Sequence, residues 1–83
     1  MNKILIHVYV PALQMWFDVL IPDFLKCNDI VSALGNLIAD VTEGKYYSSG
    51  EEILCSNDSL KVFKGEKTLN EYGVTNGENL LFM

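Results

Sequence analysis

The sequence predicts an α+β fold in which one helix packs on a mixed sheet of four to five strands. Two observations carry this prediction. Strand-like alternation of apolar residues fills 3–10 and 15–21, and helical spacing of apolar residues fills 28–44. Short strand-like runs and turn residues follow, up to the end of the chain. A chain of 83 residues is the size of one domain, so we expect a single domain over residues 1–83.

The first two strands are expected to form a hairpin across the turn "PALQ", residues 11–14. Side chains of a strand alternate between two faces. In residues 3–10 one face is uniformly β-branched and should face the core: Ile4, Ile6, Val8 and Val10. In residues 15–21 the face that carries Asp18 should be the outer one, and Pro22 should end the strand.

The helix is expected over 28–44, with Asn28 as its N-cap and Gly44 as the C′ residue in the left-handed conformation. One apolar stripe should cover the sheet: Ile30, Val31, Leu34, Leu37, Ile38 and Val41. Gly35 is costly inside a helix, and close packing on the sheet would explain it.

The C-terminal half predicts three short strands. Residues 52–56 and 60–63 should flank a turn in which Asn57 or Asp58 takes a positive φ. Residues 65–73 are too short for a second full helix and should form a loop with one helical turn. Asn76-Gly77 should then turn the chain into the last strand.

The expected order is ββαββ, a short helical turn, and a final β, which is the order of the β-grasp fold. A ferredoxin-like fold would need a second helix after residue 60, and the chain leaves no room for it.

The charge composition argues against two classes of binding partner, nucleic acid and anionic membranes. The formal net charge is −5, and the six lysines are dispersed along a chain without arginine. Binding to nucleic acid or to anionic membranes depends on clustered cations, so we expect neither. The apolar stretch after Lys3 is superficially similar to a signal peptide, but it alternates like a strand and includes His7 and Pro11. We expect a cytoplasmic protein with no membrane insertion.

The C-terminal third carries a family resemblance. "TLNEYGV", residues 68–74, is similar to the ubiquitin segment Thr-Leu-Ser-Asp-Tyr-Asn-Ile. "VFKGEKTLNEYGVTNGENL", residues 62–80, resembles a stretch of the YukD/EsaB family of small bacterial ubiquitin-like proteins. That family is encoded with type VII (WXG100) secretion systems. The resemblance implies a ubiquitin-like fold with Leu69 and Val74 in the core, and with the Tyr72 hydroxyl bonded to backbone near Gly65 and Glu66.

The resemblance implies a non-catalytic protein-docking module, an accessory or regulatory component of a type VII secretion system. Its partner would be a cytoplasmic domain of the secretion machinery or a second copy of the chain. Ubiquitin and the sulfur carriers end in a flexible tail with Gly-Gly, whereas residues 80–83 read Leu-Leu-Phe-Met. We therefore expect no conjugation. The alternatives are a ubiquitin-like modifier or sulfur carrier, and an unrelated dimeric β-grasp adaptor.

No enzyme site is expected. His7 is the single histidine and lies on the outer face of its strand, while Cys27 and Cys55 have no zinc-site spacing. We expect reduced thiols, although the sequence leaves one disulfide between them open. The six glycines form no phosphate-binding loop, so neither a metal nor another cofactor is expected.

A surface remains as the candidate site. If the β-branched face of residues 3–10 meets the helix, the other face points away from it, and likeness to ubiquitin turns Leu80 and Phe82 inward. An open sheet face with large apolar and aromatic side chains indicates a protein interface. The predicted protein-binding residues are Leu5, His7, Tyr9, Trp16, Leu20, Leu81 and Met83.

Overall fold

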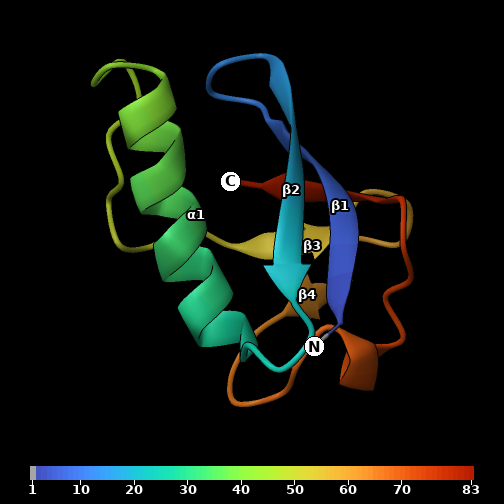
Figure 1. Cartoon of the computed structure of the whole chain (residues 1–83). Coiled ribbons are helices and arrows are strands. Elements are labelled where there is room, and N and C mark those ends of the chain that lie inside the picture. The colour runs from blue at the N-terminus through green and yellow to red at the C-terminus, as the bar shows by residue number, and fades with distance from the viewer. Residues whose placement is uncertain (1) are drawn as a thin grey trace.

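The fold is a five-stranded sheet with one long helix across one of its faces (Figure 1). The computed structural model describes residues 2–83. Its elements are β1 (Lys3–Val10), β2 (Met15–Pro22), α1 (Cys27–Val41), β3 (Leu54–Ser56), β4 (Val62–Phe63), the short 3₁₀ helix η1 (Asn70–Tyr72) and β5 (Glu78–Phe82). This order confirms the predicted β-grasp arrangement.

The strands lie in the order β2-β1-β5-β3-β4. The central strands β1 and β5 are parallel, and the other neighbours are antiparallel, so the sheet is mixed as predicted. The first and last strands of the chain are therefore hydrogen-bonded to each other. Because they are far apart in sequence, the fold closes only when the C-terminal strand has paired.

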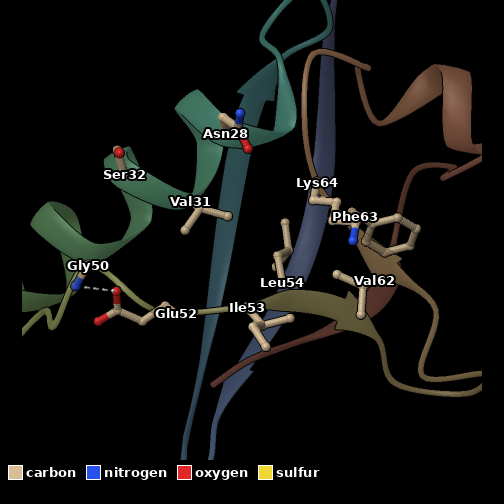
Figure 2. Close-up of a pocket in the computed structure, with 10 residues that line it drawn as sticks. All are labelled: Asn28, Val31, Ser32, Gly50, Glu52, Ile53, Leu54, Val62, Phe63 and Lys64. Atoms are coloured by element: carbon tan, nitrogen blue, oxygen red, sulfur yellow. Dashed lines mark hydrogen bonds between the residues drawn. The ribbon is translucent and has the colours of Figure 1, made fainter.

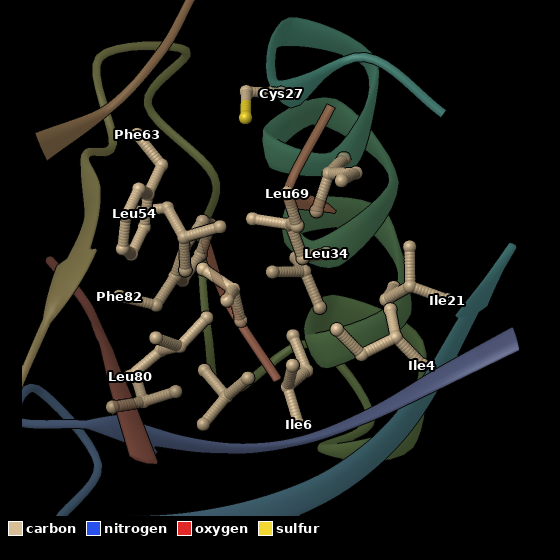
Figure 3. Packing of buried hydrophobic residues seen from close by; sticks show 14 of the residues in the cluster. Ile4, Ile6, Ile21, Cys27, Leu34, Leu54, Phe63, Leu69, Leu80 and Phe82 are labelled. Carbon is tan, nitrogen blue, oxygen red and sulfur yellow. The ribbon is translucent and has the colours of Figure 1, made fainter. Parts of the chain in front are cut away.

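The core lies between α1 and one face of the sheet (Figure 3). The β-branched face of β1 is buried, as expected, and so are Leu80 and Phe82 of β5. Leu69 and Val74 are also buried, as the resemblance to ubiquitin implies. Fully burying one such side chain stabilises the fold by roughly 1.5–3 kcal/mol, so this layer is the main source of stability.

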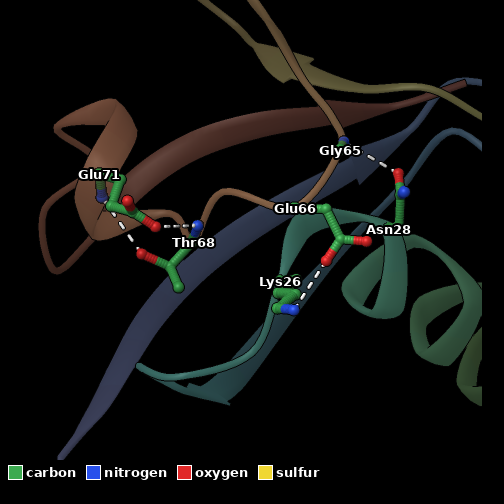
Figure 4. A network of polar contacts seen from close by, with 6 residues as sticks. All are labelled: Lys26, Asn28, Gly65, Glu66, Thr68 and Glu71. Atoms are coloured by element: carbon green, nitrogen blue, oxygen red, sulfur yellow. Dashed lines mark hydrogen bonds and ion pairs between the residues drawn. The ribbon is translucent and has the colours of Figure 1, made fainter.

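The helix starts one residue before the predicted range, and the N-cap prediction is wrong. Lys26 occupies the N-cap without a side-chain hydrogen bond. The first helical N–H groups are satisfied by a distant segment instead: Cys27 N–H donates to Lys67 O (2.8 Å) and Asn28 N–H to Gly65 O (3.1 Å). The side chain of Asn28 faces the same segment and accepts the Gly65 N–H at 2.9 Å (Figure 4).

The helix ends at Val41, three residues before the predicted end. Glu43 N–H donates to Asp40 O (3.2 Å) and Gly44 N–H to Ala39 O (2.9 Å), which is the bonding pattern of a Schellman motif. Glu43 (φ 54°) therefore takes the C′ position that was predicted for Gly44. Gly44 also has a positive φ, one position later.

The apolar stripe of the helix is narrower than predicted. Ile30, Leu34 and Ile38 are buried, whereas Leu37 and Val41 are exposed and Val31 is half-buried. Gly35 is closely packed, as expected, but against a loop rather than the sheet. A Cβ at this position would lie 2.7 Å from Ser48 Oγ.

The turn between β3 and β4 differs from the prediction. Its positive φ belongs to Leu60 (59°), not to Asn57 or Asp58. Ser56 organises the turn, because its Oγ accepts the N–H groups of Asp58 and Ser59 and its C=O accepts Leu60 N–H at 3.0 Å. Both strands are also shorter than the predicted ranges 52–56 and 60–63.

Before β5 the expected single helical turn is present as η1. Thr68 and Glu71 form a capping box at its start: Thr68 N–H donates to Glu71 Oε1 (2.9 Å) and Glu71 N–H to Thr68 Oγ1 (3.3 Å; Figure 4). The Tyr72 hydroxyl donates to Lys64 O at 2.9 Å, one residue before the expected partners.

Candidate docking surface

The sheet face opposite α1 is built by the strand register. Side chains of residues that pair across neighbouring strands point to the same face. Tyr9 pairs with Trp16 on one side and Leu81 on the other; Leu81 pairs with Cys55, and Cys55 with Val62. These five residues form one apolar row across the whole sheet. The rings of Tyr9 and Trp16 lie 4.9 Å apart between centroids, tilted by 46°.

Met83 and Ile53 extend this row. Each donates its N–H to the carbonyl of the other, at 2.9 and 2.6 Å. Both side chains are exposed, Met83 by 54% and Ile53 by 44%, and Trp16 is exposed by 52%. We name the seven residues of the row and its extension the outer patch: Tyr9, Trp16, Ile53, Cys55, Val62, Leu81 and Met83.

A polar row separates the outer patch from a smaller apolar pair. His7 pairs with Asp18 and with Asn79 across the strands, and His7 Nδ1 lies 2.5 Å from Asp18 Oδ1. Beyond it Leu5 pairs with Leu20, which is exposed by 59%. The face thus has two apolar areas with a polar pair between them, and Asp18 is the more exposed member of that pair.

All seven predicted residues lie on this outer face, but they are not contiguous. Tyr9, Trp16, Leu81 and Met83 belong to the outer patch, whereas His7, Leu5 and Leu20 lie in the polar row and beyond it. Sequence reasoning missed Ile53, Cys55 and Val62. Cys55 and Val62 lie in strands of two or three residues, and Ile53 lies just before β3, so the alternation is too short to show which way these side chains face. Their role in binding a protein stays a prediction.

The cysteines and His7 do not come together. Cys27 lies at the start of α1 and is buried in the core, on the opposite side of the sheet from His7. Burial, with a smaller contribution from the negative charge of Glu71, raises the pKa of the Cys27 thiol. Burial likewise raises the pKa of Cys55, which is 2% exposed. Both thiols are free and neither is activated as a nucleophile.

A groove of about 540 Å³ runs between α1 and the β3–β4 side of the sheet (Figure 2). Its polar residues include Glu52, whose carboxylate accepts hydrogen bonds from the Tyr46 and Ser48 hydroxyls and from the N–H groups of Ser49 and Gly50. Although burial opposes ionisation, these bonds lower the pKa of Glu52. The carboxylate is fully engaged in holding the loop after α1, so it is not positioned as a general acid or base.

The lysines are less dispersed in space than in sequence. Lys61 and Lys67 place their Nζ atoms 5.3 and 5.4 Å from the centre of the Tyr72 ring, and Lys64 is bonded to its hydroxyl through the backbone. Lys26 forms an ion pair with Glu66 at 2.7 Å (Figure 4). Two of the six lysines thus approach one aromatic ring, and a third is paired with an acidic side chain.

Within residues 2–83 no group of three or more His, Cys, Asp or Glu side chains could hold a metal ion. In the same part of the chain no helix has the length and apolar character needed to cross a membrane.

Comparison with known protein families and with characterised protein sequences finds no match. Solved structures do match. The ubiquitin-like domain of EccD5 from Mycobacterium xenopi has a TM-score of 0.81 at 11% identity, over 100% of this chain and 94% of that one. The ubiquitin-like domain of the type VII secretion system protein EccD1 from Mycobacterium tuberculosis has a TM-score of 0.77 at 15% identity, over 100% and 99%.

The same fold also occurs in an enzyme complex. A chain of the toluene 4-monooxygenase HD complex has a TM-score of 0.78 at 12% identity, over 98% of this chain and 96% of that one. At these identities the likeness shows the fold alone, which is a ubiquitin-like β-grasp, as predicted.

Proposed function

We propose that this chain is a non-catalytic docking module that serves a type VII secretion system in the bacterial cytoplasm. The outer patch is the single observation that carries docking. Tyr, Trp and Met are enriched at the cores of protein interfaces, and the patch presents all three beside Ile53 and Val62.

The assignment to secretion has two supports. Residues 62–80 resemble the YukD/EsaB family, and the ubiquitin-like domain of the type VII secretion system protein EccD1 shares the fold. The proposed partner is a cytoplasmic domain of the secretion machinery; a second copy of the chain is the other candidate. We propose no nucleic-acid or cofactor role, and no enzymatic activity.

Residues 78–83 are held firmly in the sheet. β5 pairs with β1 on one side and β3 on the other, and the Met83 backbone is bonded to Ile53. The side chains of Leu81 and Met83 are therefore fixed on the outer face, where a docked partner would meet them.

An affinity capture from native lysate tests the proposal, with elution in boiling detergent and reductant. The unmodified chain is compared with Leu81→Ser/Met83→Ser, and with Tyr47→Ser as a control at an exposed aromatic residue of the loop after α1. We expect a partner at its own mass that the double variant loses and the control keeps. A ladder of heavier species that survives detergent, or capture that the double variant retains, would contradict the proposal.

A further inference from the structure

The two edges of the sheet differ in how far they are protected. An unpaired strand edge presents free N–H and C=O groups that another strand can join. On the β4 side the edge has two residues, and the next residue, Lys64, has its backbone N–H and C=O bonded to the Tyr72 hydroxyl at 3.5 and 2.9 Å. That edge is short and capped. The β2 side has eight residues, and no side chain among residues 2–83 caps its backbone in this way.

The register shows which groups of β2 are free. Asp23 N–H donates to Asn2 O at 3.1 Å, so the bonds between β1 and β2 fall on the odd-numbered residues of β2. The pairing of β1 with β5 supports this assignment. Leu5 O accepts the Gly77 N–H at 2.8 Å, so the backbone of Leu5 points away from its β2 partner, Leu20. The N–H and C=O groups of Trp16, Asp18 and Leu20 point out from the sheet. Within residues 2–83 no hydrogen bond reaches them.

The side chains beside this edge determine what could join it. On the outer face Asp18 is exposed between Trp16 and Leu20. On the helix side Phe17 and Val19 are only partly buried, and Leu37 and Val41 are exposed one turn apart on α1. Val41 lines a hollow of about 260 Å³ with Leu13 and Met15, which places this apolar strip beside the start of β2.

We propose that the free edge of β2 binds an extended segment of a partner protein as a sixth strand, with a Lys or Arg of that segment opposite Asp18. Residues of the segment that face α1 would be apolar and cover Phe17 and Val19. The cation follows from charge: opposite charges directly across two strands are favourable and like charges unfavourable, and the chain itself carries −5. This inference rests on the proposed docking function and specifies the form of the partner.

A peptide of matching chemistry tests the edge directly. The probe is the acetylated and amidated peptide Ser-Thr-Val-Lys-Val-Tyr-Ser, titrated up to about millimolar concentration and followed by fluorescence of Trp16, the single tryptophan. Amide exchange gives the second readout. We expect a saturable blue shift, with slowed exchange at Trp16, Asp18 and Leu20 and no change at Val62.

Two matched peptides test the mechanism. The peptide with Glu in place of Lys should bind roughly fivefold more weakly, and Asp18→Lys in the protein should invert that order. In an antiparallel sixth strand the Lys opposite Asp18 donates its N–H to the Asp18 carbonyl, so methylation of that backbone nitrogen should abolish binding. In the protein, Leu20→Pro removes an outward N–H without touching the β1–β2 ladder, and it should weaken binding while the protein stays folded.

The outcomes separate this inference from the proposed function. Any one of three results would overturn strand addition at β2. These are a Trp16 fluorescence without a saturable shift, amide exchange that slows at Val62 instead of on β2, and an order of affinity for the Lys and Glu peptides that Asp18→Lys leaves unchanged. Leu81→Ser/Met83→Ser should leave peptide binding intact. If the partner captured from lysate is lost with that double variant but binds Leu20→Pro normally, docking stands and the edge is not the site. If the partner is lost with both Leu81→Ser/Met83→Ser and Leu20→Pro, the result supports both docking through the outer patch and strand addition at β2.

Discussion

The rings of Tyr9 and Trp16 pack together on the outer face of the sheet, with their centroids 4.9 Å apart. The pair connects the edge strand β2 to the central strand β1 at the outer patch. Since Trp16 is half-exposed, the pair adds little to the core and is available to a partner.

Trp16→Ala should therefore separate binding from stability. We expect it to cost less stability than a core truncation, because it loses an aromatic pair worth about 0.5–1.5 kcal/mol and the burial of only about half of the Trp16 side chain. Phe82→Ala, in the core, should cost about 3–5 kcal/mol. Chemical denaturation of both variants measures the difference. An equal loss of stability would show that Trp16 is a core residue and not part of a docking surface.

Glu52 should be a structural carboxylate. Glu52→Gln removes the ionised acceptor of four hydrogen bonds and should cost about 1–2 kcal/mol. Because its pKa is lowered in the folded state, the stabilisation is present above the unfolded-state pKa and is lost as the pH falls through the folded-state pKa. The free energy of unfolding should fall less on acidification in Glu52→Gln than in the unmodified protein. An equal fall in both proteins would contradict a structural role for the Glu52 carboxylate.

Tyr46 should ionise only at unusually high pH. Burial first, then the hydrogen bond and charge of Glu52, raise its pKa to about 12. A raised pKa means that its stabilisation is present below the unfolded-state value near 10 and is lost as the pH rises through about 12. Ultraviolet titration of phenolate should show a late step that Tyr46→Phe removes. Persistence of that step in Tyr46→Phe would assign it to another tyrosine.

Gly35 and Ser48 should be coupled. Alanine is favoured over glycine inside a helix by about 1 kcal/mol, but its Cβ would lie 2.7 Å from Ser48 Oγ and 3.2 Å from Ser48 Cβ. Gly35→Ala should therefore destabilise the unmodified protein and stabilise a Ser48→Gly background. A double-mutant cycle in unfolding free energy measures the coupling. Equal effects in the two backgrounds would show that the loop does not press on the helix.

The sequence predicted most of the fold because its signals are local. The alternation of β1 and the turn at Gly77 each depend on a few neighbouring residues, and both are confirmed. The wrong prediction of the N-cap depends on a distant partner. Asn28 is not the N-cap, because residues 65–67 bond the start of the helix and Asn28 faces them.

The candidate site was predictable only in part for a similar reason. The strands β1 and β2 are long enough for alternation to place Tyr9 and Trp16 on the outer face. Cys55 and Val62 join the same row through the pairing of β3 with β5 and β4, which no local pattern encodes. His7 and Asp18 separate the outer patch from the apolar pair Leu5 and Leu20, and this too can be seen only when the strand register is known.

Hydroxyl-radical footprinting of the chain, free and bound to the partner captured from lysate, would show whether the partner docks on the outer patch. We expect the partner to protect Trp16, Ile53 and Met83 from oxidation, while the exposed Tyr47 reacts as in the free protein. Protection of Tyr47, with Trp16 and Met83 unchanged, would contradict docking through the outer patch and place the interface on the helix side of the molecule.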